Sequence, residues 1–179
     1  MTPRSDFRVH VTKDYLVFSS AHFITFAGHR CESLHGHNYR VGVAIEGAID
    51  SESWYVLDFS VLKRLTKGVC DEIDHKVLLP LTNPKLSVDV DGESVAVAYQ
   101  GKRRYVFPRS DCALLNIQNT TVEMLAQYLT KRIRADLPAS VHATAIEVEV
   151  EENFGQSATY REEIDGPRVT AADEPSETR

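Results

Sequence analysis

Two stretches near the start of the chain alternate between apolar and polar residues, and this alternation most constrains the fold. Residues 7–22 (FRVHVTKDYLVFSSAH) and residues 37–48 (HNYRVGVAIEGA) are rich in β-branched and aromatic side chains. A period of two with such side chains is typical of a strand that buries one face. The sequence therefore predicts two long strands, joined by a loop that is rich in histidine and glycine.

Two amphipathic helices are predicted after these strands. Residues 60–74 carry apolar side chains at every third or fourth position, and Asp58 or Ser60 can cap the start of that helix. The second helix is predicted to begin at residues 120–123 (TTVE), which have the spacing of a capping box, and to end before Pro138. Each helix has one apolar stripe with which to pack on a sheet.

The rest of the chain completes a single predicted domain over residues 1–164. A strand is expected at 145–153 (AIEVEVEEN), and residues 84–118 have the pattern of an inserted β meander. The order of elements indicates an α+β fold, with two helices on one face of an antiparallel sheet. The polar residues 165–179 are expected to form a disordered tail.

Composition and charge narrow the classes of function. The chain has 179 residues and a net charge of -6, which disfavours a nucleic-acid binder and favours a small-molecule substrate. No apolar run approaches the ~20 residues that cross a bilayer, so we expect a cytoplasmic protein without membrane contact.

Unpaired sheet edges favour a homo-oligomer. Cys70 and Cys112 are expected to serve in packing, and an odd count of three cysteines implies no disulfide framework.

Three histidines form the strongest candidate for a functional site. His35 and His37 are one residue apart, so on a strand their side chains share a face. His22 ends the preceding strand and reaches the same place if the two strands pair antiparallel. Three imidazoles leave one coordination position open, which is the pattern of catalytic zinc, so we predict a Zn²⁺ site. Ordinary structural histidines are the alternative, which is favoured for any one of them alone.

Four further residues have side chains suited to chemistry. Cys31 lies beside Arg30, whose charge would favour the thiolate, so the thiol could act as a base or nucleophile; an inert packed cysteine is the alternative. Asp74 and His75 pair a carboxylate with an imidazole, which could move a proton or interact with the helix dipole. Glu152 lies on the apolar face of its strand, where it needs a partner such as N–H groups of a ligand.

These residues belong to a series of motifs that runs through residues 7–161, apart from the insertion. The motifs are Phe18-Ser-Ser-Ala-His22, Cys31-x-x-x-His35-Gly-His37-Asn-Tyr39, Leu57-Asp58-Phe59, Asp74-His75, Thr120-Thr121-x-Glu123, and Glu152 eight residues before Tyr160. In order and spacing the series resembles the 6-pyruvoyltetrahydropterin synthase and 6-carboxytetrahydropterin synthase family. Cys-x-x-x-His-Gly-His with a distant histidine is its most specific part.

This resemblance implies a particular fold and assembly. In the tunnelling fold (T-fold) of the family, subunits join their sheets into a barrel, two trimers commonly stack as a hexamer, and the active sites lie between subunits. The resemblance also implies that His22, His35 and His37 bind Zn²⁺, which holds the hydroxylated side chain of 7,8-dihydroneopterin triphosphate. A homohexamer that acts on a pterin is therefore expected.

The resemblance further implies roles for the remaining site residues. Cys31 would shuttle protons at the substrate side chain, with Asp74 and His75 as its relay. Glu152 would bind the amino and ring N–H groups of the pterin. Two more residues match a pair near the pterin pocket, although they also suit a helix cap: Thr120 and Thr121.

The spacing of the motif favours one reaction within the family. Four residues from Cys31 to His35 resemble the carboxy-forming enzyme of the queuosine (7-deazaguanine) route. We therefore expect a carbon–carbon lyase that yields 6-carboxy-5,6,7,8-tetrahydropterin, acetaldehyde and triphosphate. The alternatives are the pyruvoyl-forming synthase, a carbon–oxygen lyase, and a zinc- and pterin-binding module without chemistry. Two departures bear on this choice: Asn153 where the family usually has Thr, and Glu32, because some relatives use a glutamate in place of the cysteine.

Overall fold

β1 (Phe7–His22) and β2 (His35–Gly47) are the longest strands of the structure, a computed structural model that describes residues 7–28 and 30–164. They pair antiparallel, as predicted, and β2 begins at His35, two residues earlier than expected. The pairing register shifts between Thr12 and Val17, and from there to the end of β1 every second side chain is buried. The predicted alternation is therefore confirmed where the strand packs on the core.

The main sheet has six strands in the order β7-β3-β1-β2-β8-β9. β8 (Ala143–Asn153) and β9 (Gln156–Glu163) extend the antiparallel pairing at one edge, so the predicted antiparallel sheet is confirmed. At the other edge β3 (Val77–Pro80) and β7 (Cys112–Leu115) add two short strands in parallel. The expectation that 145–153 holds the last strand is wrong, because β9 follows it.

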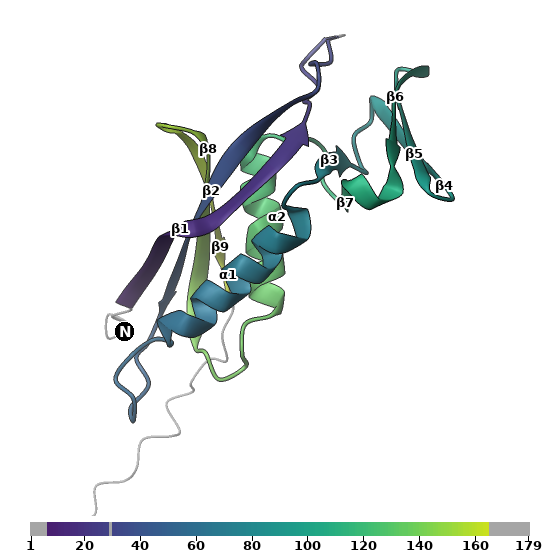
Figure 1. The fold of residues 1–179 in the computed structure, drawn as a ribbon. Coiled ribbons are helices and arrows are strands. Elements are labelled where there is room, and N and C mark those ends of the chain that lie inside the picture. Colours follow the sequence, from purple (N-terminus) through teal and green to yellow (C-terminus); the bar gives the residue numbers. More distant parts are fainter. Residues whose placement is uncertain (1–6, 29, 165–179) are drawn as a thin grey trace, which may run out of the picture.

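Two helices cover one face of this sheet (Figure 1). α1 (Phe59–Ile73) packs on β1, and α2 (Val122–Ala135) packs on β8 and β9 and contacts α1. Removing their apolar stripes from water drives this packing. The core between the layers includes buried side chains from both helices and from the strands: Leu62, Val69, Ile73, Leu125, Leu129, Ile133, Leu16, Phe18, Tyr39, Val43, Ile146 and Val148.

The two helices begin in different ways. The side chain of Asp58 caps α1 by accepting a hydrogen bond from the backbone N–H of Ser60 at 2.7 Å. Thr121 is the N-cap residue of α2, but its side chain makes no capping hydrogen bond. The hydroxyl of Thr120 instead donates to the carbonyl of Phe23 at 2.9 Å. The predicted capping box is therefore not formed, because Thr120 ties the helix start to the end of β1.

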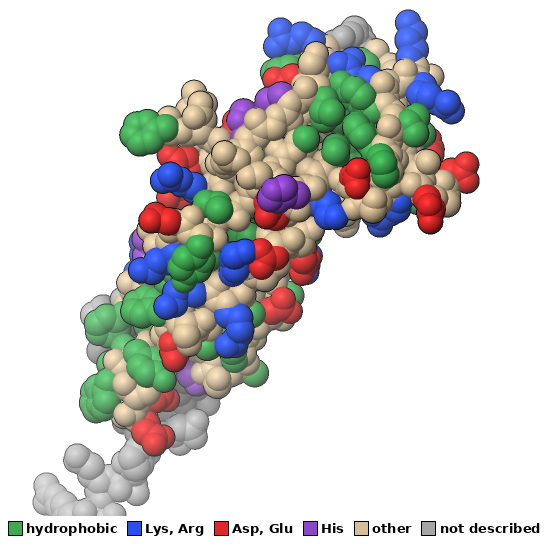
Figure 2. Space-filling view, in the orientation of Figure 1, with side chains coloured by type: hydrophobic (Ala, Val, Ile, Leu, Met, Phe, Trp, Pro, Cys, Tyr) green, Lys and Arg blue, Asp and Glu red, His purple; other side chains and the backbone are tan. Residues whose placement is uncertain are grey.

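The predicted meander within 84–118 is a separate three-stranded antiparallel sheet. It consists of β4 (Leu86–Asp91), β5 (Ser94–Tyr99) and β6 (Lys102–Pro108), and a 3-10 turn leads from it into β7. Figure 2 shows Lys and Arg side chains at the upper right, over the outer end of this sheet. A second buried cluster joins the sheet to the rest of the molecule: Phe23, Leu79, Val95, Val97 and Cys112.

The remaining expectations about organisation concern thiols, membranes and the tail. Cys70 and Cys112 are both buried in hydrophobic clusters, which confirms that they serve in packing. Within the described residues, neither helix is long and apolar enough to cross a membrane. The predicted tail, residues 165–179, lies outside the described part of the chain.

Candidate metal centre and active site

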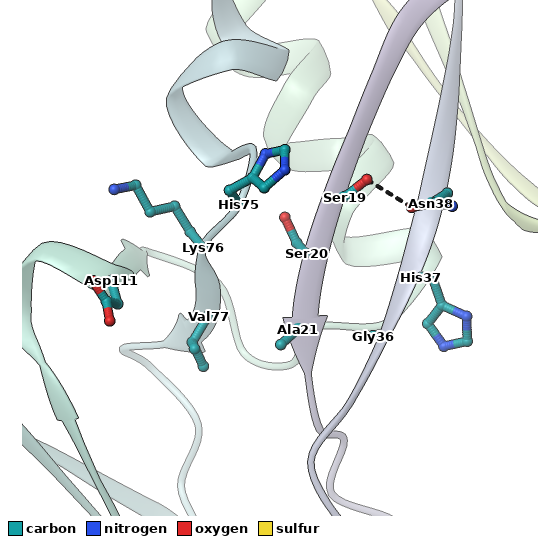
Figure 3. Close-up of a pocket in the computed structure, with 10 residues that line it drawn as sticks. All are labelled: Ser19, Ser20, Ala21, Gly36, His37, Asn38, His75, Lys76, Val77 and Asp111. Atoms are coloured by element: carbon teal, nitrogen blue, oxygen red, sulfur yellow. Dashed lines mark hydrogen bonds between the residues drawn. The ribbon is translucent and has the colours of Figure 1, made fainter.

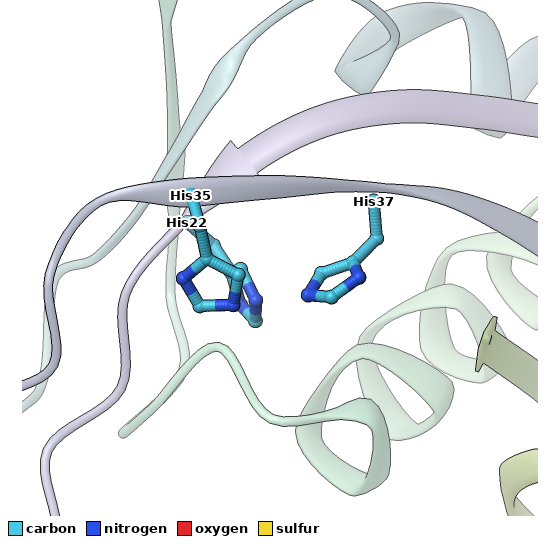
Figure 4. Close-up of side chains that lie close together, drawn as sticks. All are labelled: His22, His35 and His37. Carbon is cyan, nitrogen blue, oxygen red and sulfur yellow. The ribbon is translucent and has the colours of Figure 1, made fainter.

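His22, His35 and His37 lie together where β1 ends and β2 begins (Figure 4). Each offers one ring nitrogen, and these three atoms all lie within 4.8 Å of one another. The ring centroids are 4.7 Å apart for His22 and His35 and 4.8 Å apart for His35 and His37. Three imidazoles at this separation could share one metal ion, which is the arrangement that the strand phase predicts.

The pairing of the two strands explains why the histidines meet. His22 lies opposite His35 in the antiparallel register, so the two side chains project from the same face. Gly36 separates the two β2 histidines, and a Cβ at that position would lie only 3.1 Å from the carbonyl oxygen of Ser20. A residue with no side chain at position 36 therefore permits the close approach of β1 and β2.

Hydrogen bonds orient two of the three rings. Nδ1 of His22 lies 2.8 Å from the carbonyl oxygen of Thr120, and Nδ1 of His35 lies 3.0 Å from that of Ser33. Because a carbonyl can only accept, each Nδ1 carries the proton, which leaves Nε2 available to a metal. Among the described residues, Nε2 of His22 and of His37 is buried without a hydrogen-bond partner, which costs free energy that a bound cation would recover. The residues present therefore fit a metal ion.

Burial also affects the charge of the most enclosed of the three histidines. The side chain of His22 is only 2% exposed, whereas that of His35 is 37% exposed. Desolvation by burial is the main cause that lowers the pKa of His22, and the neighbouring His35 lowers it further. A neutral imidazole is the form that binds a metal, so His22 is held in a ligating state.

Glu152 on β8 lies directly beside the histidines. One carboxylate oxygen of Glu152 is 3.3 Å from Nε2 of His22 and 3.3 Å from Nε2 of His37. Burial raises the pKa of the Tyr39 phenol, and the charge of Glu152 raises it further. Among the described residues, the buried hydroxyl of Tyr39 has no hydrogen-bond partner. An unprotonated imidazole nitrogen does not donate to a carboxylate, so these two approaches of Glu152 to the histidines are not hydrogen bonds, and its negative charge beside the cluster favours a bound cation.

Cys31 lies in the loop between β1 and β2, and its surroundings differ from the sequence expectation. The guanidinium of Arg30 stacks over the ring of Phe26 at 4.0 Å, so Arg30 does not serve the thiol as predicted. Burial raises the pKa of Cys31, the charge of Arg104 lowers it, and the charge of Glu32 raises it. The sequence interpretation missed Arg104, for which the only signal is a basic run in the insertion.

Glu32 is closer to the metal centre than its place in the loop indicates. Its carboxylate lies 3.8 Å from Nδ1 of His35 and accepts a hydrogen bond from the backbone N–H of Ile24 at 3.3 Å. The backbone N–H of Glu32 in turn donates to the carbonyl of Ile24 at 2.9 Å. Two contacts to one residue hold this carboxylate beside the histidine.

Asp74 and His75 form the predicted pair at the end of α1. The carboxylate of Asp74 lies 3.0 Å from Nδ1 of His75 and accepts from the backbone N–H of Ser19 at 2.7 Å. Desolvation raises the pKa of Asp74, but the hydrogen bonds from Ser19 and His75 outweigh it and lower the pKa. Figure 3 shows His75 and His37 on opposite sides of β1. Within the described chain, no hydrogen bond or ion pair links Asp74 or His75 to Cys31.

A surface groove of about 540 Å³ has His37 and His75 among its lining residues. The side chain of His75 is 82% exposed at one side of it. Its lining comes from β1, β2, the start of β3 and the 3-10 turn: Ser19, Ser20, Ala21, Gly36, His37, Asn38, His75, Lys76, Val77 and Asp111. The groove therefore borders the Asp74–His75 pair, and His37 is the only one of the three clustered histidines among its lining residues.

Thr120 and Thr121 stand at the start of α2. Thr120 is fully buried, and its carbonyl orients the ring of His22. Thr121 is partly buried and contributes the N-cap position of the helix. The structure thus gives Thr120 a positioning role toward a predicted metal ligand, and contact of either residue with a pterin stays a prediction.

The family of the chain follows from a comparison over almost its whole length. The family model for 6-pyruvoyl tetrahydropterin synthase matches residues 10–163. The chain belongs to the 6-pyruvoyl tetrahydropterin synthase family. Within that family it is 36% identical over 152 residues to a Methanocaldococcus jannaschii protein provisionally named 6-carboxy-5,6,7,8-tetrahydropterin synthase, a match that covers 84% of this chain and 92% of the relative.

Another protein similar to this chain has a different named activity. A dihydroneopterin monophosphate aldolase from Pyrococcus furiosus is 26% identical over 138 residues, which are 77% of this chain and 87% of the aldolase. The family resemblance seen in the motifs is thus confirmed, and it spans relatives with more than one named reaction.

Solved structures of the 6-pyruvoyl tetrahydropterin synthase family share the fold. The Plasmodium vivax 6-pyruvoyl tetrahydropterin synthase superposes with a TM-score of 0.82 at 29% identity, covering 90% of this chain and all of that chain. Two further structures of that enzyme are variants in which a catalytic glutamate is replaced by alanine or by cysteine. The predicted T-fold is confirmed for the single subunit.

Proposed function

We propose that the protein is a zinc-dependent lyase that acts on a reduced pterin. The reaction we assign converts 7,8-dihydroneopterin triphosphate and one molecule of water to 6-carboxy-5,6,7,8-tetrahydropterin, acetaldehyde and triphosphate, in the queuosine (7-deazaguanine) pathway. The observation that carries the proposal is the convergence of His22, His35 and His37, with two of their Nε2 atoms buried and unpartnered. The similarity to the Methanocaldococcus jannaschii relative supports this choice of product.

Each residue has a defined task in this proposal. The three histidines hold Zn²⁺, which when bound supplies a Lewis acid that polarises the oxygens of the substrate side chain. Glu152 accepts hydrogen bonds from the amino and ring N–H groups of the pterin, a charge-assisted contact that fixes its orientation. The thiol of Cys31 takes and returns protons at the side-chain carbons.

The direct test is the product formed from 7,8-dihydroneopterin triphosphate. Zinc-loaded protein is expected to consume this substrate and yield 6-carboxytetrahydropterin and acetaldehyde, which liquid chromatography with mass spectrometry identifies. Protein treated with a chelator is the control, and its turnover should fall to background and return when zinc is added. Absence of turnover with one zinc ion per chain would contradict the proposal and favour a binding module without chemistry.

A second candidate function is cleavage of the substrate side chain in the manner of an aldolase. Two observations favour it: Glu32 lies 3.8 Å from His35, and the Plasmodium vivax enzyme depends on a catalytic glutamate. The similarity to an aldolase from Pyrococcus furiosus agrees with it. Glu32 would then act as the base, and the product would keep a hydroxymethyl group. The same mass spectra separate this product from the carboxy product and from the pyruvoyl product of triphosphate elimination.

We also propose that the proton relay is completed between subunits. No hydrogen bond or ion pair within the described chain links Cys31 to Asp74 or His75, although all three lie on or near the surface. The main sheet has edge strands β7 and β9, which a second copy could extend by backbone pairing. A homohexamer built as two trimers would let the Asp74–His75 pair of one subunit reach the thiol of another.

Complementation between inactive variants tests this arrangement. Cys31→Ala and His75→Ala proteins are each expected to lose most activity, because each lacks one part of the relay. When the two are unfolded together and refolded as mixed oligomers, some sites should combine intact Cys31 with intact His75, and activity should return to about a quarter of wild type. Activity in a demonstrably monomeric protein, or no recovery in confirmed mixed oligomers, would contradict a shared site.

A further inference from the structure

The inserted sheet contacts the loop that carries Cys31 and Glu32. Nη2 of Arg104 on β6 donates a hydrogen bond to the carbonyl of Glu32 at 2.8 Å and lies 3.4 Å from the carbonyl oxygen of Cys31. One guanidinium therefore meets two successive carbonyls. Arginine suits such a contact because its donors form a planar fork that does not need to rotate to reach both acceptors.

Tyr105, the next residue of β6, holds the same limb of the loop. Its hydroxyl accepts a hydrogen bond from the backbone N–H of Leu34 at 3.1 Å, and its ring lies 5.3 Å from the ring of Phe23. Cys31 itself is partly buried against the hydrophobic cluster that contains Phe23. The segment just before the β2 histidines is thus fixed by polar contacts and by packing.

The other limb of the loop is held from the start of the insertion. Nζ of Lys85 donates to the carbonyl of Phe26 at 2.6 Å and to the carbonyl of Gly28 at 2.8 Å. Within the loop, the backbone N–H of Phe26 donates to the carbonyl of Arg30 at 3.0 Å, which closes a narrow hairpin. The insertion therefore contacts both limbs of one hairpin that leads from β1 to β2.

We propose that the three-stranded sheet is a clamp on this loop, and that Arg104 is a positioning residue that fixes Cys31 and Glu32 and keeps a positive charge beside the thiol. The catalytic meaning of this inference rests on the proposed function, since it assigns proton transfer to Cys31. The contacts between the sheet and the loop are present in the structure whichever reaction the protein catalyses. The insertion would then contribute to the reaction by positioning this loop, although none of the three predicted metal ligands lies in it.

The charges around the thiol are few, which makes the role of Arg104 measurable. Among the described residues, Arg104 on β6 favours the thiolate of Cys31, and Glu32 in the loop opposes it. The side chain of Tyr105 is the main cause that raises the pKa of Arg104, and the thiolate of Cys31 raises it further. Removing the guanidinium charge should therefore leave the thiol with Glu32 as its main charged neighbour, and less of it ionised at a given pH.

The test is the rate at which iodoacetamide alkylates Cys31, followed by mass spectrometry of the peptide across a range of pH. In Arg104→Gln we expect alkylation of Cys31 at pH 7.5 to be about threefold slower and its dependence on pH to move upward, because only the thiolate reacts. Arg104→Lys keeps the charge and should retain most of the wild-type rate. Arg103→Gln is the matched control, since among the described residues no hydrogen bond or ion pair involves the exposed side chain of Arg103.

Two outcomes would overturn the inference. Alkylation of Arg104→Gln at or above the wild-type rate would mean that Arg104 does not favour the thiolate, and an equal slowing in Arg103→Gln would mean that the effect is not local. Tyr105→Phe gives a second measurement if Arg104→Gln folds poorly. Loss of the hydroxyl should speed hydrogen exchange of the Leu34 amide, and unchanged exchange would argue against a clamp.

These measurements do not depend on turnover. Alkylation and hydrogen exchange report on the loop whether or not the protein converts a pterin, so failure of the proposed function and failure of the clamp are distinguishable. Where turnover is measured, Arg104→Gln should lower kcat and shift its pH profile upward, with KM little changed. A merely structural loss would lower kcat without moving that profile.

Discussion

Replacing His35 by alanine is expected to weaken zinc binding by about a hundredfold or more. Four ligands together give a structural zinc site roughly 10–16 kcal/mol, so one ligand of such a set contributes a few kcal/mol. His35 is the best choice of the three because its side chain is 37% exposed, whereas His22 is buried and its removal would leave a cavity. The fold should therefore survive the change.

The measurement is zinc per chain after dialysis against a weak chelator, with thermal unfolding as the check on the fold. His75→Ala is the matched control, because His75 is an exposed histidine that is outside the cluster. The control should keep one zinc ion per chain, and His35→Ala should keep almost none. Equal zinc content in the two variants would show that the three histidines are not the metal site.

Replacing Cys31 by alanine is expected to lower formation of 6-carboxytetrahydropterin by about a hundredfold or more, with zinc content unchanged. General acid–base groups typically contribute 10²–10⁴ to a rate, and no other thiol can substitute, since Cys70 and Cys112 are buried. Glu32→Gln is the companion variant. It removes the carboxylate beside His35 but keeps the carbonyl that Arg104 contacts.

The two variants together decide which residue carries which reaction. If Cys31 serves the carboxy-forming reaction and Glu32 serves side-chain cleavage, each change should remove one product and spare the other. Both products are measured in one chromatogram from the same substrate preparation. Wild-type formation of 6-carboxytetrahydropterin by Cys31→Ala would contradict the assignment of the thiol, and loss of both products in both variants would indicate a shared function.

Local patterns in the sequence were sufficient to predict the parts of the fold that form the metal centre. The alternation in β1 and β2 fixes which side chains share a face, and antiparallel pairing then brings His22 opposite His35. Asp58 is a cap because its side chain meets a backbone N–H only two residues away. Such features depend on neighbours along the chain or on one strand pair, so a single sequence contains them.

Features that depend on distant parts of the chain were harder to predict. β9 is an edge strand without a fully buried side chain, so its apolar signal is weak. β3 and β7 have four residues each and gain their partners only when the chain returns to the sheet. Arg104 is more than 70 positions from Cys31, and nothing along the chain between them indicates that they meet. The prediction that Arg30 favours the thiolate of Cys31 was wrong, because adjacency in the sequence does not fix where a long side chain points.

The division of the site between strands and loop has a consequence for how such an enzyme can diverge. The three histidines of the predicted metal site stand on two paired strands, whereas Cys31 and Glu32 stand on a hairpin that a separate sheet holds. Substitutions in the hairpin or in the sheet that holds it can change the acid–base groups without altering the spacing of the three histidines. If the proposed function holds, new reactions on the same pterin would be accessible in small mutational steps that each leave the three histidines in place.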